Sequence, residues 1–193
     1  MVNSVAIFSG KGGVGKSTIA AALAQLSDST LLDCDPQLSV SDWGDRRSGS
    51  PSVIATQLGR VPALLQQHQQ IIVDTPGALV GNVITALQSV DLVLVITSDR
   101  QLEIDALPAT LQVARQANKP TAVLLNRLHP KTDPRSIFAI LQALNATACP
   151  VVIRERSAHY RAWTLGKTAA EYQPDSDAAQ EIRQLWQWIK ESY

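Results

Sequence analysis

A glycine-rich stretch near the start of the chain carries the residue types and the spacing that bind phosphate groups. Positions 10–17 read Gly-Lys-Gly-Gly-Val-Gly-Lys-Ser, which matches the pattern GxxxxGK[ST] between an apolar run and a helix-like run. Glycines let successive backbone N–H groups point at phosphate oxygens, and the following helix adds its dipole. In this pattern Lys16 supplies a charge for the β- and γ-phosphates, and Ser17 supplies a hydroxyl ligand for Mg²⁺. The stretch therefore predicts a site for a nucleoside triphosphate.

Two acidic motifs further along the chain could complete this site. Asp-Cys-Asp-Pro-Gln at 33–37 follows one apolar run, and Asp-Thr-Pro-Gly at 74–77 follows another. Asp35 could orient an attacking water or hold Mg²⁺ through water, and Asp74 could hold the Mg²⁺ shell. Aspartates at strand ends also serve as turn residues. The phosphate-binding loop that precedes both motifs favours the chemical interpretation.

Alternating apolar and helix-like stretches indicate how these motifs are positioned. Continuous apolar runs, as in parallel strands buried on both faces, predict a doubly wound, mostly parallel α/β sheet with helices on both sides and ligands at the carboxyl ends of the strands. With 193 residues we expect a single domain, 1–193. The predicted strands are 2–8, 30–32, 71–73, 92–96, 122–125, 151–153 and, on weaker grounds, 53–55. The predicted helices are 16–26, 62–68, 82–88, 102–117 and 133–144.

A second lysine in the loop, Lys11, points to a particular class of phosphate-binding protein. An ordinary loop of this kind needs no lysine there, and the pattern KGGVGK[ST] resembles the deviant Walker A ATPases of the ParA/MinD family. The DxDPQ motif is similar to that of ParA-type members. The resemblance implies that Lys11 reaches the nucleotide of a partner subunit and that Asp35 is the catalytic aspartate. It also implies adenine contact by Asn126, and nucleotide contact by Gly12, Gly13, Val14, Gly15, Lys16, Ser17 and Thr18.

The function implied by this resemblance is that of a small ParA-type partition or positioning ATPase. Its cofactors would be ATP and Mg²⁺, and ATP would drive a sandwich homodimer that binds nonspecific DNA. A ParB-like partner would stimulate hydrolysis, so that a plasmid, a chromosome or a protein assembly is moved. A MinD-like membrane-cycling ATPase is the alternative. A metal-cluster carrier would need paired cysteines, and Cys34 and Cys149 are far apart. A ligase of the dethiobiotin-synthetase type would not need Lys11.

Charge offers little support for nucleic-acid binding by the whole chain. Lys and Arg number 17, as do Asp and Glu, so the formal net charge is zero and any DNA contact must come from a local patch. The candidate patch contains Arg154, Arg156, Arg161 and Lys167. Solvated surface charge is an equally good interpretation of the same residues.

The C-terminal stretch, residues 178–193, has a single apolar helical face. Ile182, Leu185, Trp186 and Ile189 fall on that face, and the charges around it are balanced. We therefore expect a helix packed on the sheet, since a membrane-surface helix would carry a basic face. The sequence also favours a cytoplasmic, nucleoid-associated protein without stable membrane association and without an N-terminal helix-turn-helix.

Overall fold

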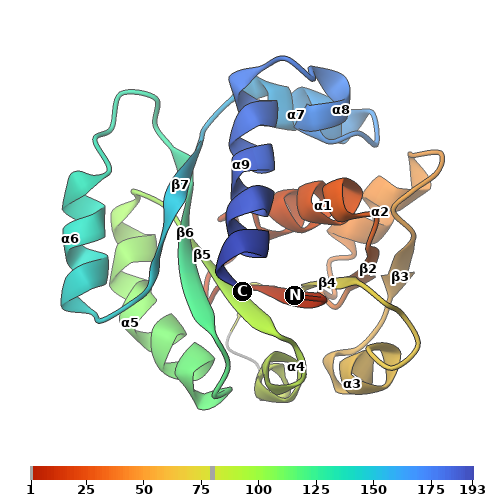
Figure 1. The fold of residues 1–193 in the computed structure, drawn as a ribbon, viewed down its shortest axis with the longest axis horizontal. Coiled ribbons are helices and arrows are strands. Elements are labelled where there is room, and N and C mark those ends of the chain that lie inside the picture. Colours follow the sequence, from red (N-terminus) through yellow and green to blue (C-terminus); the bar gives the residue numbers. More distant parts are fainter. Residues whose placement is uncertain (1, 79–80) are drawn as a thin grey trace.

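The computed structural model of this protein describes residues 2–78 and 81–193 and contains one seven-stranded sheet (Figure 1). Every paired strand runs parallel to its neighbour, and the order across the sheet is β3-β2-β4-β1-β5-β6-β7. This confirms the predicted doubly wound parallel sheet. The strands are β1 Ser4–Phe8, β2 Thr30–Asp33, β3 Val53–Ala55, β4 Ile71–Asp74, β5 Leu92–Thr97, β6 Thr121–Leu128 and β7 Ala148–Arg154.

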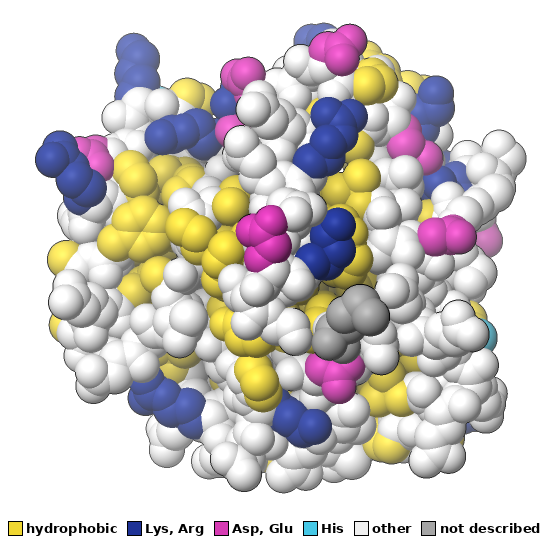
Figure 2. Space-filling view, viewed as in Figure 1, with side chains coloured by type: hydrophobic (Ala, Val, Ile, Leu, Met, Phe, Trp, Pro, Cys, Tyr) yellow, Lys and Arg dark blue, Asp and Glu magenta, His cyan; other side chains and the backbone are white. Residues whose placement is uncertain are grey.

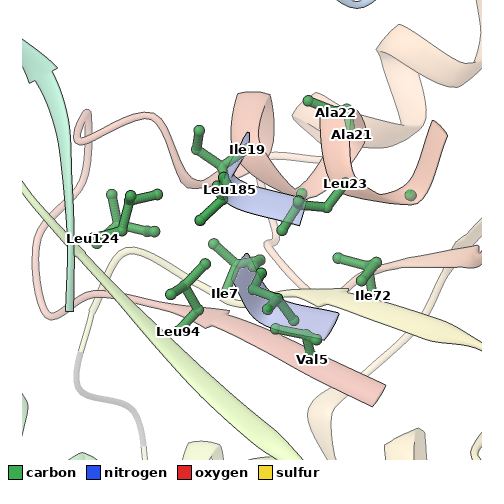
Figure 3. Close-up of a cluster of buried hydrophobic side chains, with 14 of the residues drawn as sticks. Val5, Ile7, Ile19, Ala21, Ala22, Leu23, Ile72, Leu94, Leu124 and Leu185 are labelled. Atoms are coloured by element: carbon green, nitrogen blue, oxygen red, sulfur yellow. The ribbon is translucent and has the colours of Figure 1, made fainter. Parts of the chain in front are cut away.

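The helices cover both faces of this sheet. One core cluster joins α1 and α9 to one face, and the second joins the stretch from α3 to α6 to the other (Figure 1). Figure 3 shows side chains of α1 and α9, such as Ile19 and Leu185, above Ile7, Leu94 and Leu124 of the sheet. The helices are α1 Lys16–Ser27, α2 Ser39–Asp45, α3 Val61–Leu64, α4 Val83–Ser89, α5 Gln101–Gln116, α6 Arg135–Ala143, α7 Ser157–Thr164, α8 Ala169–Tyr172 and α9 Asp177–Ser192, with a 3₁₀ turn at Leu58–Arg60.

The C-terminal helix α9 packs on the protein itself, as the sequence predicts. Ile182, Leu185 and Ile189 are fully buried, and the helix contacts α1 and β7. On the face that carries α9, cationic and anionic side chains are interspersed beside apolar ones (Figure 2). Among the described residues, no helix is both long enough and apolar enough to cross a membrane.

The structure contains three short helices that the sequence does not predict. α2, α7 and α8 contain seven, eight and four residues, too few for a clear helical period. The predicted helix 62–68 ends earlier, because α3 stops at Leu64 and the chain then turns. α2 follows β2 and α7 follows β7, so both helices begin near the carboxyl end of a strand, where the sequence places its chemical residues.

Candidate nucleotide site

The glycine-rich loop lies between β1 and α1 and exposes the N-terminus of a twelve-residue helix. Gly13 and Gly15 have φ angles of 81° and 89°, in the left-handed region that favours glycine. A Cβ atom on Gly15 would lie 2.5 Å from the side-chain amide nitrogen of Asn126, so a larger residue would force that side chain to move. The loop can therefore keep this curled path only with glycine at that position.

A cleft of about 720 Å³ opens above the loop. It brings together most of the residues that the sequence singles out, from the loop, from the end of β2 and from the end of β6. Val14 is buried and Lys11 is exposed, and neither lines the cleft. The predicted nucleotide residues that line it are Gly12, Gly13, Gly15, Lys16, Ser17, Thr18, Asp35 and Asn126.

Beneath the cleft, Asp74 at the end of β4 is completely buried, and neither of its carboxylate oxygens accepts a hydrogen bond of normal geometry from the described residues. Burial raises the pKa of Asp74 to about 7, although the nearby Ser17 hydroxyl and Lys16 ammonium act to lower it. An orphaned carboxylate beside a hydroxyl is a donor set that suits a hard cation. The residues present therefore fit Mg²⁺.

Lys16 places an ammonium group in the same region. The residue is 6% exposed, and burial lowers the pKa of its ammonium group, while Asp74 and Asp35 act to raise that pKa. Neither carboxylate comes within ion-pair distance of it in the described chain. A buried cation without a direct partner is costly unless an anion arrives to pair with it.

The two aspartates of the DxDPQ motif have different environments. Asp33 is buried and accepts hydrogen bonds from the backbone N–H and hydroxyl of Ser41, both at 2.8 Å, so it ties α2 to β2. Asp35 lines the cleft, and the N–H of Gln37 at 3.0 Å is the hydrogen-bond donor found for its carboxylate within residues 2–78 and 81–193. Asp35 therefore keeps lone pairs for water, whereas Asp33 has a structural role.

The segment after β4 packs directly on the glycine-rich loop. Thr75 donates its hydroxyl to the carbonyl of Ile7 at 2.8 Å. A Cβ atom on Gly77 would lie 2.8 Å from the Cα of Gly12 and 3.3 Å from the Nζ of Lys16. Residues 75–77 thus pack against β1, the phosphate-binding loop and its lysine. Positions 79 and 80, which follow, lie outside the described residues.

The predicted basic cluster is divided between bound and free cations. Arg154 donates to the carbonyl oxygens of His129, Pro130 and Thr132. Arg156 pairs with Asp177 and Glu181, both at 2.8 Å. Arg161 and Lys167 are exposed, and no ion pair to either is found in the described part of the chain. Two of the four side chains are therefore occupied by the protein itself.

The far end of the cleft is formed by residues that the sequence analysis did not assign to the site. Arg127 and Glu155 pair at 3.1 Å across the ends of β6 and β7. α7 contributes His159, Tyr160 and Trp163 to the lining. Their position at the end of β6 and soon after β7 could have indicated a role in the site, because ligands of a doubly wound sheet bind at and beyond the carboxyl ends of its strands.

Comparison with known proteins identifies relatives that share this architecture. A family model described as the CobQ/CobB/MinD/ParA nucleotide binding domain matches residues 5–168. The maintenance of carboxysome distribution protein A of Gloeobacter kilaueensis is 31% identical over an alignment of 209 positions, and this alignment covers 94% of this chain and 94% of that protein.

Solved structures share the fold at lower sequence identity. The cell division ATPase MinD of Pyrococcus furiosus superposes with a TM-score of 0.78 at 21% identity, over 100% of both chains. The ATP complex of a substituted McdA from Cyanothece superposes with a TM-score of 0.79 at 17% identity, over 98% of this chain and 96% of that one.

Proposed function

Since the chain belongs to the CobQ/CobB/MinD/ParA nucleotide-binding family, we propose that it is an ATP-hydrolysing switch that positions a cargo in the cell. The observation that carries this proposal is the orphaned, fully buried carboxylate of Asp74 next to the buried ammonium of Lys16. Lys16 lines a cleft whose volume suits a nucleotide, and Asp74, outside that lining, is close enough to act on the charge of Lys16. ATP with Mg²⁺ supplies the partners that both groups lack.

Each residue of the cleft has a distinct task in this proposal. Lys16 and the backbone N–H groups of the loop bind the phosphates, and Ser17 and Asp74 hold Mg²⁺. Bound Mg²⁺ would neutralise charge that develops on the transferred phosphoryl group. Asp35 orients the attacking water, because its carboxylate faces the cleft and keeps unused lone pairs.

Hydrolysis should separate from binding when Asp35 is replaced. In Asp35→Ala we expect normal ATP binding and a turnover lower by at least about a hundredfold, because the water loses its positioning group. Phosphate release and calorimetry measure the two quantities on the same sample. Normal turnover in Asp35→Ala would assign the water to another residue.

We propose further that ATP makes a homodimer and that Lys11 acts across it. The Lys11 side chain is exposed and does not line the cleft of its own subunit, so it is available to a second one. Light scattering with a nonhydrolysable ATP analogue should give a dimer for the natural chain and a monomer for Lys11→Ala. A Lys11→Ala dimer of unchanged stability would make Lys11 an ordinary surface residue.

The cargo proposal follows the curated relative, whose name assigns it to the distribution of carboxysomes. We propose that the ATP dimer binds nucleoid DNA without sequence preference and that a ParB-like activator, bound to a protein assembly, a plasmid or a chromosome, triggers release. Arg161 and Lys167 are the exposed cations for this contact. A two-fold dimer doubles their number, and binding strength grows steeply with the number of phosphates neutralised.

Fluorescence anisotropy on two unrelated duplexes tests the DNA contact. We expect binding with the ATP analogue and none with ADP, equal affinity for both sequences, and a steep loss with salt. Arg161→Ala should weaken it and leave nucleotide affinity intact. Binding to liposomes instead of DNA would favour a MinD-like membrane cycle.

A further inference from the structure

Two consecutive residues of β6 hold two consecutive carbonyl groups of the phosphate-binding loop. The side-chain amide of Asn126 donates to the carbonyl oxygen of Val14 at 2.7 Å. The guanidinium of Arg127 donates to the carbonyl oxygen of Gly13. Both side chains also pack against Gly15, since a Cβ there would lie 2.5 Å from the Asn126 amide nitrogen and 3.6 Å from the Arg127 Cδ.

Peptide geometry turns these contacts into a constraint on the phosphate site. In a planar trans peptide the carbonyl of one residue and the N–H of the next point in opposite directions. Because β6 holds the carbonyl of Gly13, the N–H of Val14 is directed away from β6. Because β6 also holds the carbonyl of Val14, the N–H of Gly15 is directed away from β6 as well. Phosphate binding requires loop N–H groups in fixed directions.

Arg127 is itself held in place from two sides. Its backbone lies in the left-handed region, with φ 55°, where the pairing of β6 with β7 is irregular. Its guanidinium pairs with Glu155 at 3.1 Å, and Glu155 lies 3.8 Å from Arg100. Strain of this kind persists where the surroundings determine the conformation, and it is typical of functional sites.

From this geometry we infer that Asn126 and Arg127 are positioning residues that preorganise the loop for the triphosphate, whichever base the nucleotide carries. This inference rests on the proposed ATP site, and it differs from the adenine contact that the sequence predicts for Asn126. One N–H of the Asn126 amide is already donated to Val14, and this bond does not depend on the base that the second N–H or the carbonyl oxygen could meet. Loss of either donor should therefore weaken ATP, GTP and inorganic tripolyphosphate by the same factor.

The test uses Asn126→Leu, which keeps the approximate shape, cannot donate and adds no charge, together with Arg127→Ala and Arg127→Lys. For each of the first two we expect an affinity loss of about tenfold, the effect of one hydrogen bond, equal for ATP, GTP and tripolyphosphate in magnesium buffer. Arg127→Lys should recover part of the loss, because an ammonium can still donate to one carbonyl. Calorimetry measures affinity, and thermal unfolding checks that the variants remain folded.

Glu155→Gln distinguishes positioning from direct contact between Arg127 and phosphate. If Arg127 positions the loop, Glu155→Gln frees the guanidinium and weakens all three ligands; a gain in affinity would overturn the inference. So would an Asn126→Leu variant that changes the ratio of ATP to GTP affinity while tripolyphosphate binding stays normal. Arg60→Ala, on the 3₁₀ turn outside the cleft lining, serves as control. A natural chain that binds neither ATP nor tripolyphosphate would instead refute the proposed function.

Discussion

The floor of the cleft and the joint between α2 and α8 both bury charge, but they handle it in opposite ways. The floor consists of Lys16 and the neighbouring Asp74; within residues 2–78 and 81–193, Asp74 accepts no hydrogen bond of normal geometry and Lys16 has no direct ion pair. At the joint, the Arg47 side chain is 6% exposed and pairs with Glu171 at 2.9 Å. Arg47 also donates to the carbonyl of Gly166 at 2.9 Å and lies 4.5 Å above the ring of Trp43.

The free-energy cost of burying a charge explains why the floor and the joint differ. An unpaired buried charge destabilises the fold, so it persists where a ligand completes it. A paired and hydrogen-bonded charge needs nothing more, and removing one partner is what costs stability. Substitutions at the floor of the cleft are therefore expected to change nucleotide affinity, and substitutions at the joint are expected to change stability against denaturant.

Lys16→Ala is expected to give the largest effect among these substitutions, and this effect should be on nucleotide binding alone. The variant removes the charge that faces the phosphates, so nucleotide affinity should fall by at least about a hundredfold. Calorimetry with ATP and Mg²⁺ measures the loss, and circular dichroism should report an unchanged fold. Near-normal affinity would show that Lys16 is not the phosphate ligand and would remove the contrast with the joint.

Arg47→Ala should show the opposite pattern. It breaks the pair with Glu171, leaves the carbonyl of Gly166 without its donor and uncovers Trp43, so stability should fall by about 2–4 kcal/mol. Nucleotide affinity should stay within about twofold, because Arg47 does not line the cleft. Urea unfolding measures the change. Arg135→Ala is the matched control, since its pair with Asp133 is exposed and its loss should not be measurable.

These two regions also differ in how well the sequence predicts them. The strands, the loop and the acidic motifs follow from local patterns, because continuous apolar runs and closely spaced glycines act over a few residues. The joint depends on residues 124 positions apart, Arg47 and Glu171, and no local pattern predicts that contact. A Thr-x-x-Glu capping box at 168–171 marks the start of α8, and this pattern is visible in the sequence.

Asn126 shows a second limit of sequence-based prediction. Its position at the end of β6 follows from the apolar run before it, and the structure places it at the cleft. Which atom it contacts depends on the path of the loop, because Gly15 must lack a side chain for the amide to reach Val14. That contact joins a strand and a loop that are far apart in the sequence, so no local pattern predicts it.

Gly166→Ala should damage the joint by a different route. Gly166 has φ 65°, and a Cβ there would lie 2.6 Å from the carbonyl carbon of Arg46 and 2.8 Å from the nitrogen of Arg47. Steric overlap and backbone strain together should cost about 1–3 kcal/mol in urea unfolding. Gly59→Ala is the control, because nothing lies within 4 Å of its Cβ position. Equal stability of the two variants would mean that α2 and the turn before α8 can separate freely.

The smallest expected effect is the response of the joint to acid. Burial raises the pKa of Glu171, but hydrogen bonds from Arg47 and from Thr168 outweigh it, so the pKa lies below its ordinary value of 4.5. A carboxyl group whose pKa is lowered by folding stabilises the protein above its unfolded pKa, and that stability is lost as the pH falls through the lowered value. The stability of the natural chain should therefore drop between about pH 5 and the lowered pKa. Glu171→Gln should be less stable at neutral pH and should show a shallower drop over the same interval. Urea midpoints at several pH values measure how steeply the stability of each protein depends on pH. Equal steepness in the two proteins would assign the acid sensitivity to another carboxylate. It would also mean that the charge of Glu171 does not contribute to the stability of the joint.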